Sequence, residues 1–132
     1  MNKTVLKMHS GNGESYQFTY KGHMRYSPNC SSTSGYGSDD WYYLCEHSGK
    51  SYMLHFEVNG AYGFGCWDGT PLNAGAEEEL KTADINQWRQ LLYAEGWEGT
   101  VKLSLDNIDE IRHILPTSSR IGYLNDNHYR GC

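Results

Sequence analysis

The sequence predicts an α+β fold: an antiparallel sheet of five to seven strands, with two helices packed on one face of the sheet. Three observations predict it. Residues 15–21 alternate between apolar and polar, residues 41–67 have the pattern of a three-stranded meander, and two later segments carry apolar residues at helical spacing. The chain has 132 residues, which is the size of one domain, and we expect a single α+β domain over residues 1–132.

The first two strands are expected at residues 4–9 and 15–21. The strict alternation of the second strand places its large aromatic side chains on one face, which we expect to be buried. These side chains are Tyr16, Phe18 and Tyr20. Residues 27–40 are rich in Ser, Gly and Asp and are expected to form a long loop. Loops of this length are often functional, so this segment is a candidate for binding.

The meander contains two turn signals, Ser48-Gly49 and Asn59-Gly60, and a two-residue turn fixes the register of the strands it joins. The first turn is expected to pair Cys45 with Tyr52, Tyr43 with Leu54, and Trp41 with Phe56. The second is expected to pair His55 with Phe64 and Met53 with Cys66.

These registers divide the side chains of the meander between two faces. One is expected to be a core face, formed by Trp41, Tyr43, Cys45, Tyr52, Leu54, Phe56, Val58, Gly63, Gly65 and Trp67. The other carries the rows Tyr42–His55–Phe64, Leu44–Met53–Cys66 and Glu57–Tyr62. The second face is too apolar for a solvated surface, so either the sheet is covered on both sides or this face binds a ligand.

The second half of the chain begins with an expected loop at residues 68–82, which contains an acidic run. Asp84 is expected to cap a helix over residues 85–95, with Gln87 completing a capping box. The buried stripe of this helix is expected to consist of Ile85, Trp88 and Leu92.

A strand over residues 100–105 follows, and a second helix is expected after Asp106. Its buried stripe is expected to be Ile108, Ile111 and Leu115. Pro116 should end it, and the tail after Thr117 could supply a closing edge strand.

Composition excludes some classes of function. The net charge of −5 and the isoelectric point of about 5.6 disfavour direct binding to nucleic acid, which is normally achieved by a basic surface. The mean hydropathy of −0.72 disfavours a membrane span. The first residues lack the apolar core of a signal peptide, so we expect a cytoplasmic protein.

The four cysteines are widely spaced, and we expect reduced thiols, with Cys45 and Cys66 buried in strands.

No complete catalytic, cofactor-binding or metal-binding motif is found in the sequence. Cys45 and His47 are two residues apart on an expected strand, but nothing in the spacing of the other histidines brings further ligands to them. The Ser32-Thr33-Ser34 run is similar to a motif of some ADP-ribosyltransferases, but their strand arginine and downstream acidic motif are not matched. We therefore expect a protein that is not an enzyme and needs neither cofactor nor metal.

Two functional hypotheses remain. In size, charge and aromatic content the chain resembles bacterial toxin-immunity proteins and phage-encoded inhibitors of nucleases or host defence systems. The first hypothesis is therefore a small acidic inhibitor that occupies a basic surface of a partner protein, such as a nuclease or a nucleic-acid-binding complex. The residues expected to contact the partner are Tyr36, Asp39, Asp40, Trp41, Glu77, Glu78 and Glu79. The alternative is a small-ligand-binding domain or minor enzyme that uses the face containing Tyr42, His55, Phe64 and Tyr62.

Overall fold

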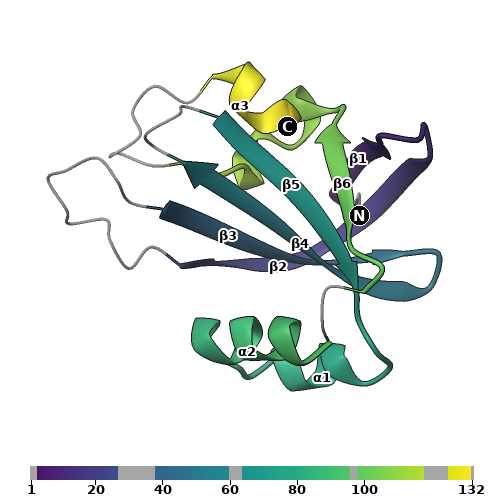
Figure 1. The fold of residues 1–132 in the computed structure, drawn as a ribbon, viewed down its shortest axis with the longest axis vertical. Helices are drawn as coiled ribbons and strands as arrows, with labels where there is room; N and C mark the ends of the chain where they lie inside the picture. The colour runs from purple at the N-terminus through teal and green to yellow at the C-terminus, as the bar shows by residue number, and fades with distance from the viewer. Residues whose placement is uncertain (1–2, 27–37, 60–63, 96–97, 118–124, 132) are drawn as a thin grey trace, which may run out of the picture.

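The computed structural model describes residues 3–26, 38–59, 64–95, 98–117 and 125–131. Six strands form a closed barrel in which each strand is antiparallel to the next and the last pairs with the first (Figure 1). The strands are β1 (Val5–Ser10), β2 (Ser15–Tyr26), β3 (Ser38–His47), β4 (Lys50–Asn59), β5 (Phe64–Pro71) and β6 (Val101–Leu105). The predicted antiparallel sheet is therefore confirmed. Its closure into a barrel was not predicted.

Strand β2 is longer than the predicted segment because it continues past a bulge at its centre. Tyr20 pairs with Cys45 and His23 pairs with Tyr43, so one extra residue is inserted on β2 between these positions. The extra residue restores His23 to the inward face that Tyr20 occupies, where a strict period of two would have placed Gly22. Strand β3 begins at Ser38, so the last three residues of the predicted loop 27–40 belong to a strand.

The β3–β4 hairpin has the predicted register. Cys45 pairs with Tyr52 and Trp41 with Phe56. The turn residues Ser48 and Gly49 have φ values of 50° and 76°. Two consecutive left-handed residues are typical of the tight turn that matches the twist of a hairpin, and glycine adopts this conformation without a steric penalty.

The predicted register of the β4–β5 hairpin is wrong by four residues. His55 pairs with Asp68 instead of Phe64, and Met53 pairs with Thr70 instead of Cys66. The last pair before the turn is Asn59 with Phe64, so residues 60–63, which lie outside the described part of the chain, separate the strands. Because the error is an even number of residues, the division of side chains between the two faces is unchanged.

The helices follow the prediction only in part. Helix α2 (Ile85–Glu95) is confirmed, and its cap has the expected geometry: the backbone N–H of Gln87 donates to the Asp84 carboxylate, and the backbone N–H of Asp84 donates to the Gln87 side chain. The predicted loop 68–82 instead contains the end of β5 and a short helix, α1 (Ala76–Leu80).

The predicted second helix is replaced by two 3₁₀ turns, η1 (Ile108–Glu110) and η2 (Arg112–Ile114), which bury Ile108 and Ile114. A further helix, α3 (Asp126–Arg130), was not predicted. The region proposed for a closing strand falls mostly on residues 118–124, outside the described residues.

Two separate clusters of buried side chains stabilise the fold. The first fills the barrel and consists of residues from the inward faces of the strands together with Ile108, Ile111, Ile114, Leu115 and Tyr129. The second lies outside the barrel, where α1 and α2 cover β3 and β4: Tyr42, Leu44, Met53, Leu72, Ala76, Leu80, Trp88 and Leu92. Figure 1 shows α1 and α2 against one side of the barrel, with α3 at the opposite side. The apolar outer face of the meander is therefore a second core.

Candidate functional site

Helix α1 presents the acidic run at the protein surface. Ala76 and Leu80 are buried against the second core, with exposed fractions of 3% and 2%, and this anchors the helix. The residues between them are directed outward: Glu78 and Glu79 are exposed and Glu77 is half-buried. Within these five residues the two ends are buried and the three glutamates between them face outward. The acidic run, which was expected in a loop, therefore lies on a short helix.

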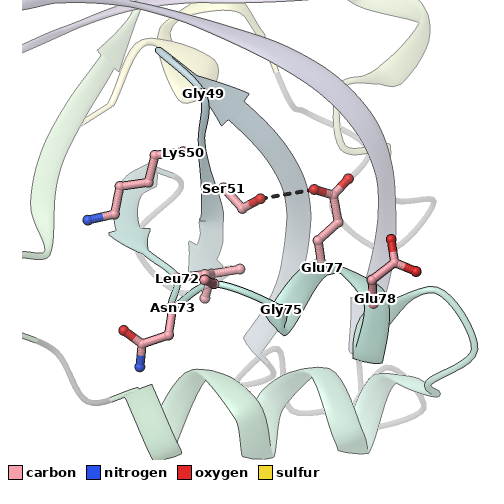
Figure 2. Close-up of a pocket in the computed structure, with 9 residues that line it drawn as sticks. Gly49, Lys50, Ser51, Leu72, Asn73, Gly75, Glu77 and Glu78 are labelled. Carbon is pink, nitrogen blue, oxygen red and sulfur yellow. Dashed lines mark hydrogen bonds between the residues drawn. The ribbon is translucent and has the colours of Figure 1, made fainter.

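A pocket of about 470 Å³ lies beside this helix (Figure 2). Three segments line it: the end of the β3–β4 turn, the link between β5 and α1, and α1 itself. The lining residues are Gly49, Lys50, Ser51, Leu72, Asn73, Ala74, Gly75, Glu77 and Glu78. The backbone N–H of Leu72 donates to the carbonyl of Ser51 over 2.8 Å, which fixes the link against the start of β4.

Glu77 is the most constrained side chain of the pocket. Lys21 Nζ lies 2.7 Å from its Oε1, and the Ser51 hydroxyl donates to its Oε2 over 3.0 Å. Lys21 also forms an ion pair with Glu46, at 3.0 Å. The hydrogen bond from Lys21 is the main cause that lowers the pKa of the Glu77 carboxyl, and the hydrogen bond from Ser51 acts in the same direction. Glu77 is therefore ionised at neutral pH and fixed in orientation.

Asp39 and Trp41, two of the expected partner contacts, face the interior of the barrel. Their exposed fractions are 3% and 7%. Asp39 accepts from Arg25 Nε at 2.8 Å and Nη2 at 2.7 Å, and from Trp41 Nε1 at 3.0 Å. A carboxylate with a bidentate arginine partner is compensated within the fold, so these side chains are part of the barrel structure. Tyr36 lies outside the described residues.

The alternative ligand face lies partly under the second core. The rings of Tyr42 and His55 stack with centroids 4.7 Å apart, and their exposed fractions are 5% and 9%. His55 Nε2 is 2.7 Å from Asp40 Oδ1, so Asp40, another of the predicted contact residues, is also engaged internally. Tyr62 and the side chain of Phe64 are outside the described part of the structure. Tyr42 and His55 are therefore packed rather than open to a ligand.

The cysteines differ from the expectation in one respect. Cys45 is buried and free, and burial raises the pKa of its thiol, as expected for an inert thiol in a core. Cys66 is half-buried and disulfide-bonded, so the expectation that it is a reduced, buried thiol is wrong. Among the described residues, no group of three or more His, Cys, Asp or Glu side chains is placed to hold a metal ion.

The sequence reasoning identified the acidic run but missed the other walls of the pocket. Lys50, Ser51 and Asn73 are polar residues beside turns, which is also where ordinary solvent-exposed residues occur, so composition could not distinguish them. What brings these residues together is the close approach of the β3–β4 turn and the β5–α1 link. That approach depends on how α1 packs beside the β3–β4 hairpin, which the local sequence does not specify.

Comparison with known proteins adds no family. No family model matches the chain, and no curated protein or solved structure matches it. In the described part of the chain, no helix is both long and apolar enough to span a bilayer.

Proposed function

We propose that this protein is a small acidic binding module without catalytic activity, which acts as an inhibitor by occupying a basic surface of a partner protein. The observation that carries the proposal is the display of Glu77, Glu78 and Glu79 on α1, a helix fixed to the barrel by Ala76 and Leu80. A rigid acidic turn attracts a cationic surface over a distance of several ångströms and suppresses association with acidic proteins. We place the protein in the cytoplasm as part of the same proposal; disulfides such as that of Cys66 are uncommon in this compartment.

The residues that we propose to contact the partner protein are those of the acidic run on α1. Asp39, Asp40 and Trp41 are engaged within the fold, so they support the strands beside the contact surface instead of forming it. Glu79 is exposed and forms no ion pair within the described part of the chain, unlike Glu77 and Glu78. Its charge is therefore the least compensated of the acidic run, and it should contribute most to attraction of a partner.

The test compares two charge reversals that change the net charge equally. Glu79→Lys alters the run on α1, and Glu98→Lys alters an exposed carboxylate elsewhere. Each takes the formal charge from −5 to −3. Proteins retained from a cell extract by the wild type are identified by mass spectrometry, purified and measured by surface plasmon resonance at about 50 and 300 mM salt.

We expect Glu79→Lys to slow association with a basic partner several-fold at low salt, with little change in dissociation. Glu98→Lys should have a much smaller effect. Equal effects of the two variants would show that only net charge matters and would refute the role of α1. Turnover of a small molecule by the purified protein would refute the non-catalytic assignment.

A further inference from the structure

The pocket beside α1 has a mixed charge that the acidic-surface proposal does not use. Its volume of about 470 Å³ is within the range of about 300–1,000 Å³ that is typical of small-molecule sites. Two carboxylates and one ammonium line it, together with the Ser51 hydroxyl and the Asn73 amide. These groups come from separate segments of the chain, so the fold brings them together around one cavity.

The anionic wall is prepared to accept a cation. Each oxygen of Glu77 accepts one hydrogen bond, from Lys21 or from Ser51, and a carboxylate has about four acceptor positions in total. Two positions therefore remain on a carboxylate whose orientation is already fixed. Glu78 forms an ion pair with Lys81 at 2.7 Å, but both of these side chains are largely exposed, so this pair can be exchanged for a ligand at little cost.

The cationic side of the pocket is Lys50. This side chain is exposed and forms no ion pair among the described residues, and it is the first residue of β4, directly after the hairpin turn. In Figure 2, Lys50 and Asn73 lie on one side of the pocket and Glu77 and Glu78 on the other. An anionic group that entered beside Lys50 would therefore be separated from the carboxylates.

The region between the two charged sides is apolar or lacks side chains. Leu72 lines the pocket and is 3% exposed, Ala74 adds a methyl group, and neither Gly49 nor Gly75 has a side chain to occupy the space. A Cβ atom built at either glycine meets nothing within 4 Å. An aliphatic chain would fit this surface without displacing a polar group.

We propose that this pocket binds a small zwitterion in which an ammonium or guanidinium group and a carboxylate are joined by an aliphatic chain, that is, an ω-amino acid or a basic amino acid. The cationic end lies against Glu77 and Glu78, the carboxylate lies against Lys50 and Asn73, and the chain covers Leu72. A ligand with a single charge would leave one side of the pocket without its partner. This inference shares Glu77 and Glu78 with the acidic-surface proposal but rests on the cavity and on the cationic side at Lys50, which that proposal does not use.

The experiment uses three ligands that share a six-carbon chain and differ in which charged ends they carry: 6-aminohexanoic acid, hexylamine and hexanoic acid. Each is titrated into the ¹⁵N-labelled protein, and the amide shifts of Ser51, Leu72 and Gly75 are followed. We expect saturable shifts with 6-aminohexanoic acid, and binding up to about fivefold weaker with either single-charge analogue, because an exposed ion pair contributes up to about that factor.

Three variants locate the site. Ala74→Trp places a large ring in the pocket from an exposed position and should abolish the shifts. Lys50→Met keeps the aliphatic stem and removes the charge, so hexylamine and 6-aminohexanoic acid should then bind equally. Lys102→Met removes an exposed lysine on β6 as the matched control and should change nothing.

Several results would overturn the proposal. These are no saturable shift with 6-aminohexanoic acid, equal binding of the zwitterion and hexylamine by the wild type, and shifts that persist in Ala74→Trp. Because Glu79 does not line the pocket, Glu79→Lys should bind the zwitterion as the wild type does. Failure of the acidic-surface proposal can therefore be distinguished from failure of this one.

Discussion

Replacing Trp88 by alanine should strongly destabilise the second core. The ring is 5% exposed, and its indole N–H donates to the carbonyl of Leu80 over 3.1 Å, which links α2 to the end of α1. Burial of a tryptophan removes about 150–250 Å² from water, which at about 25 cal/mol per Å² corresponds to about 4–6 kcal/mol. The alanine that remains recovers a small part of this energy.

Two further effects change this value in opposite directions. The Leu80 carbonyl loses a buried donor, which costs about 1 kcal/mol or more. The second core lies on the outside of the barrel, so α2 can move inward and fill part of the cavity. We therefore expect Trp88→Ala to lower the free energy of unfolding by about 3–5 kcal/mol, which corresponds to a fall in Tm of about 10–20 °C for a chain of this length.

The assay is urea denaturation followed by circular dichroism, with Tyr93→Ala as the matched control. Tyr93 is on the same helix but is 58% exposed, so its replacement should cost less than about 1 kcal/mol. Equal destabilisation by the two variants would show that Trp88 does not anchor α2, and would refute the assignment of a second core between the helices and the barrel.

Three other changes test the fold and the pocket. Gly65→Ala should cost about 1–3 kcal/mol because the added Cβ would collide with the Phe56 ring and lie 2.7 Å from the carbonyl oxygen of His128. Gly11→Ala, where a Cβ meets nothing within 4 Å, is the control. Equal melting temperatures of the two variants would contradict the close approach at Gly65. Asp84→Ala removes the cap of α2 and should lower the free energy of unfolding by about 1 kcal/mol in urea denaturation. Asp84→Asn should retain most of the stability that the cap provides. Glu77→Gln should be less stable than the wild type at pH 7, and the difference should shrink as the pH falls through the lowered folded-state pKa of Glu77, since its contribution is lost on protonation. A difference that does not shrink on acidification would mean that Glu77 acts through packing rather than charge.

Local pattern predicted the strands and the first hairpin well. Alternation identified the inward residues of β2 up to Tyr20, and Ser48-Gly49 determined the β3–β4 register correctly. Asn59-Gly60 is a stronger turn signal than Ser48-Gly49, but here Asn59 is the last paired residue of β4 and the connection is longer. The observed register pairs Phe56 with Trp67, whose ring centroids are 4.5 Å apart, and the dipeptide carries no information about this packing.

The closure of the barrel and the candidate site depend on contacts between residues that are far apart in the sequence. β6 pairs with β1 through Met8 and Leu105, and no local signal specifies this pairing. The same reason explains the aromatic residues that were expected at an interface. Tyr43 and Trp41 face inward because a closed barrel needs large side chains to fill it, whereas an open sheet would have left some of them at the surface.

Closure through β6 also gives the barrel a weak point. This strand pairs with β1 only from Met8 to Ser10 and with β5 only from Trp67 to Gly69, whereas β3 and β4 pair along their whole length. Release of β6 would expose two unpaired strand edges, each able to accept the same strand from another molecule. At high concentration this would permit the segment that begins with β6 to exchange between copies, which is a route to a domain-swapped dimer.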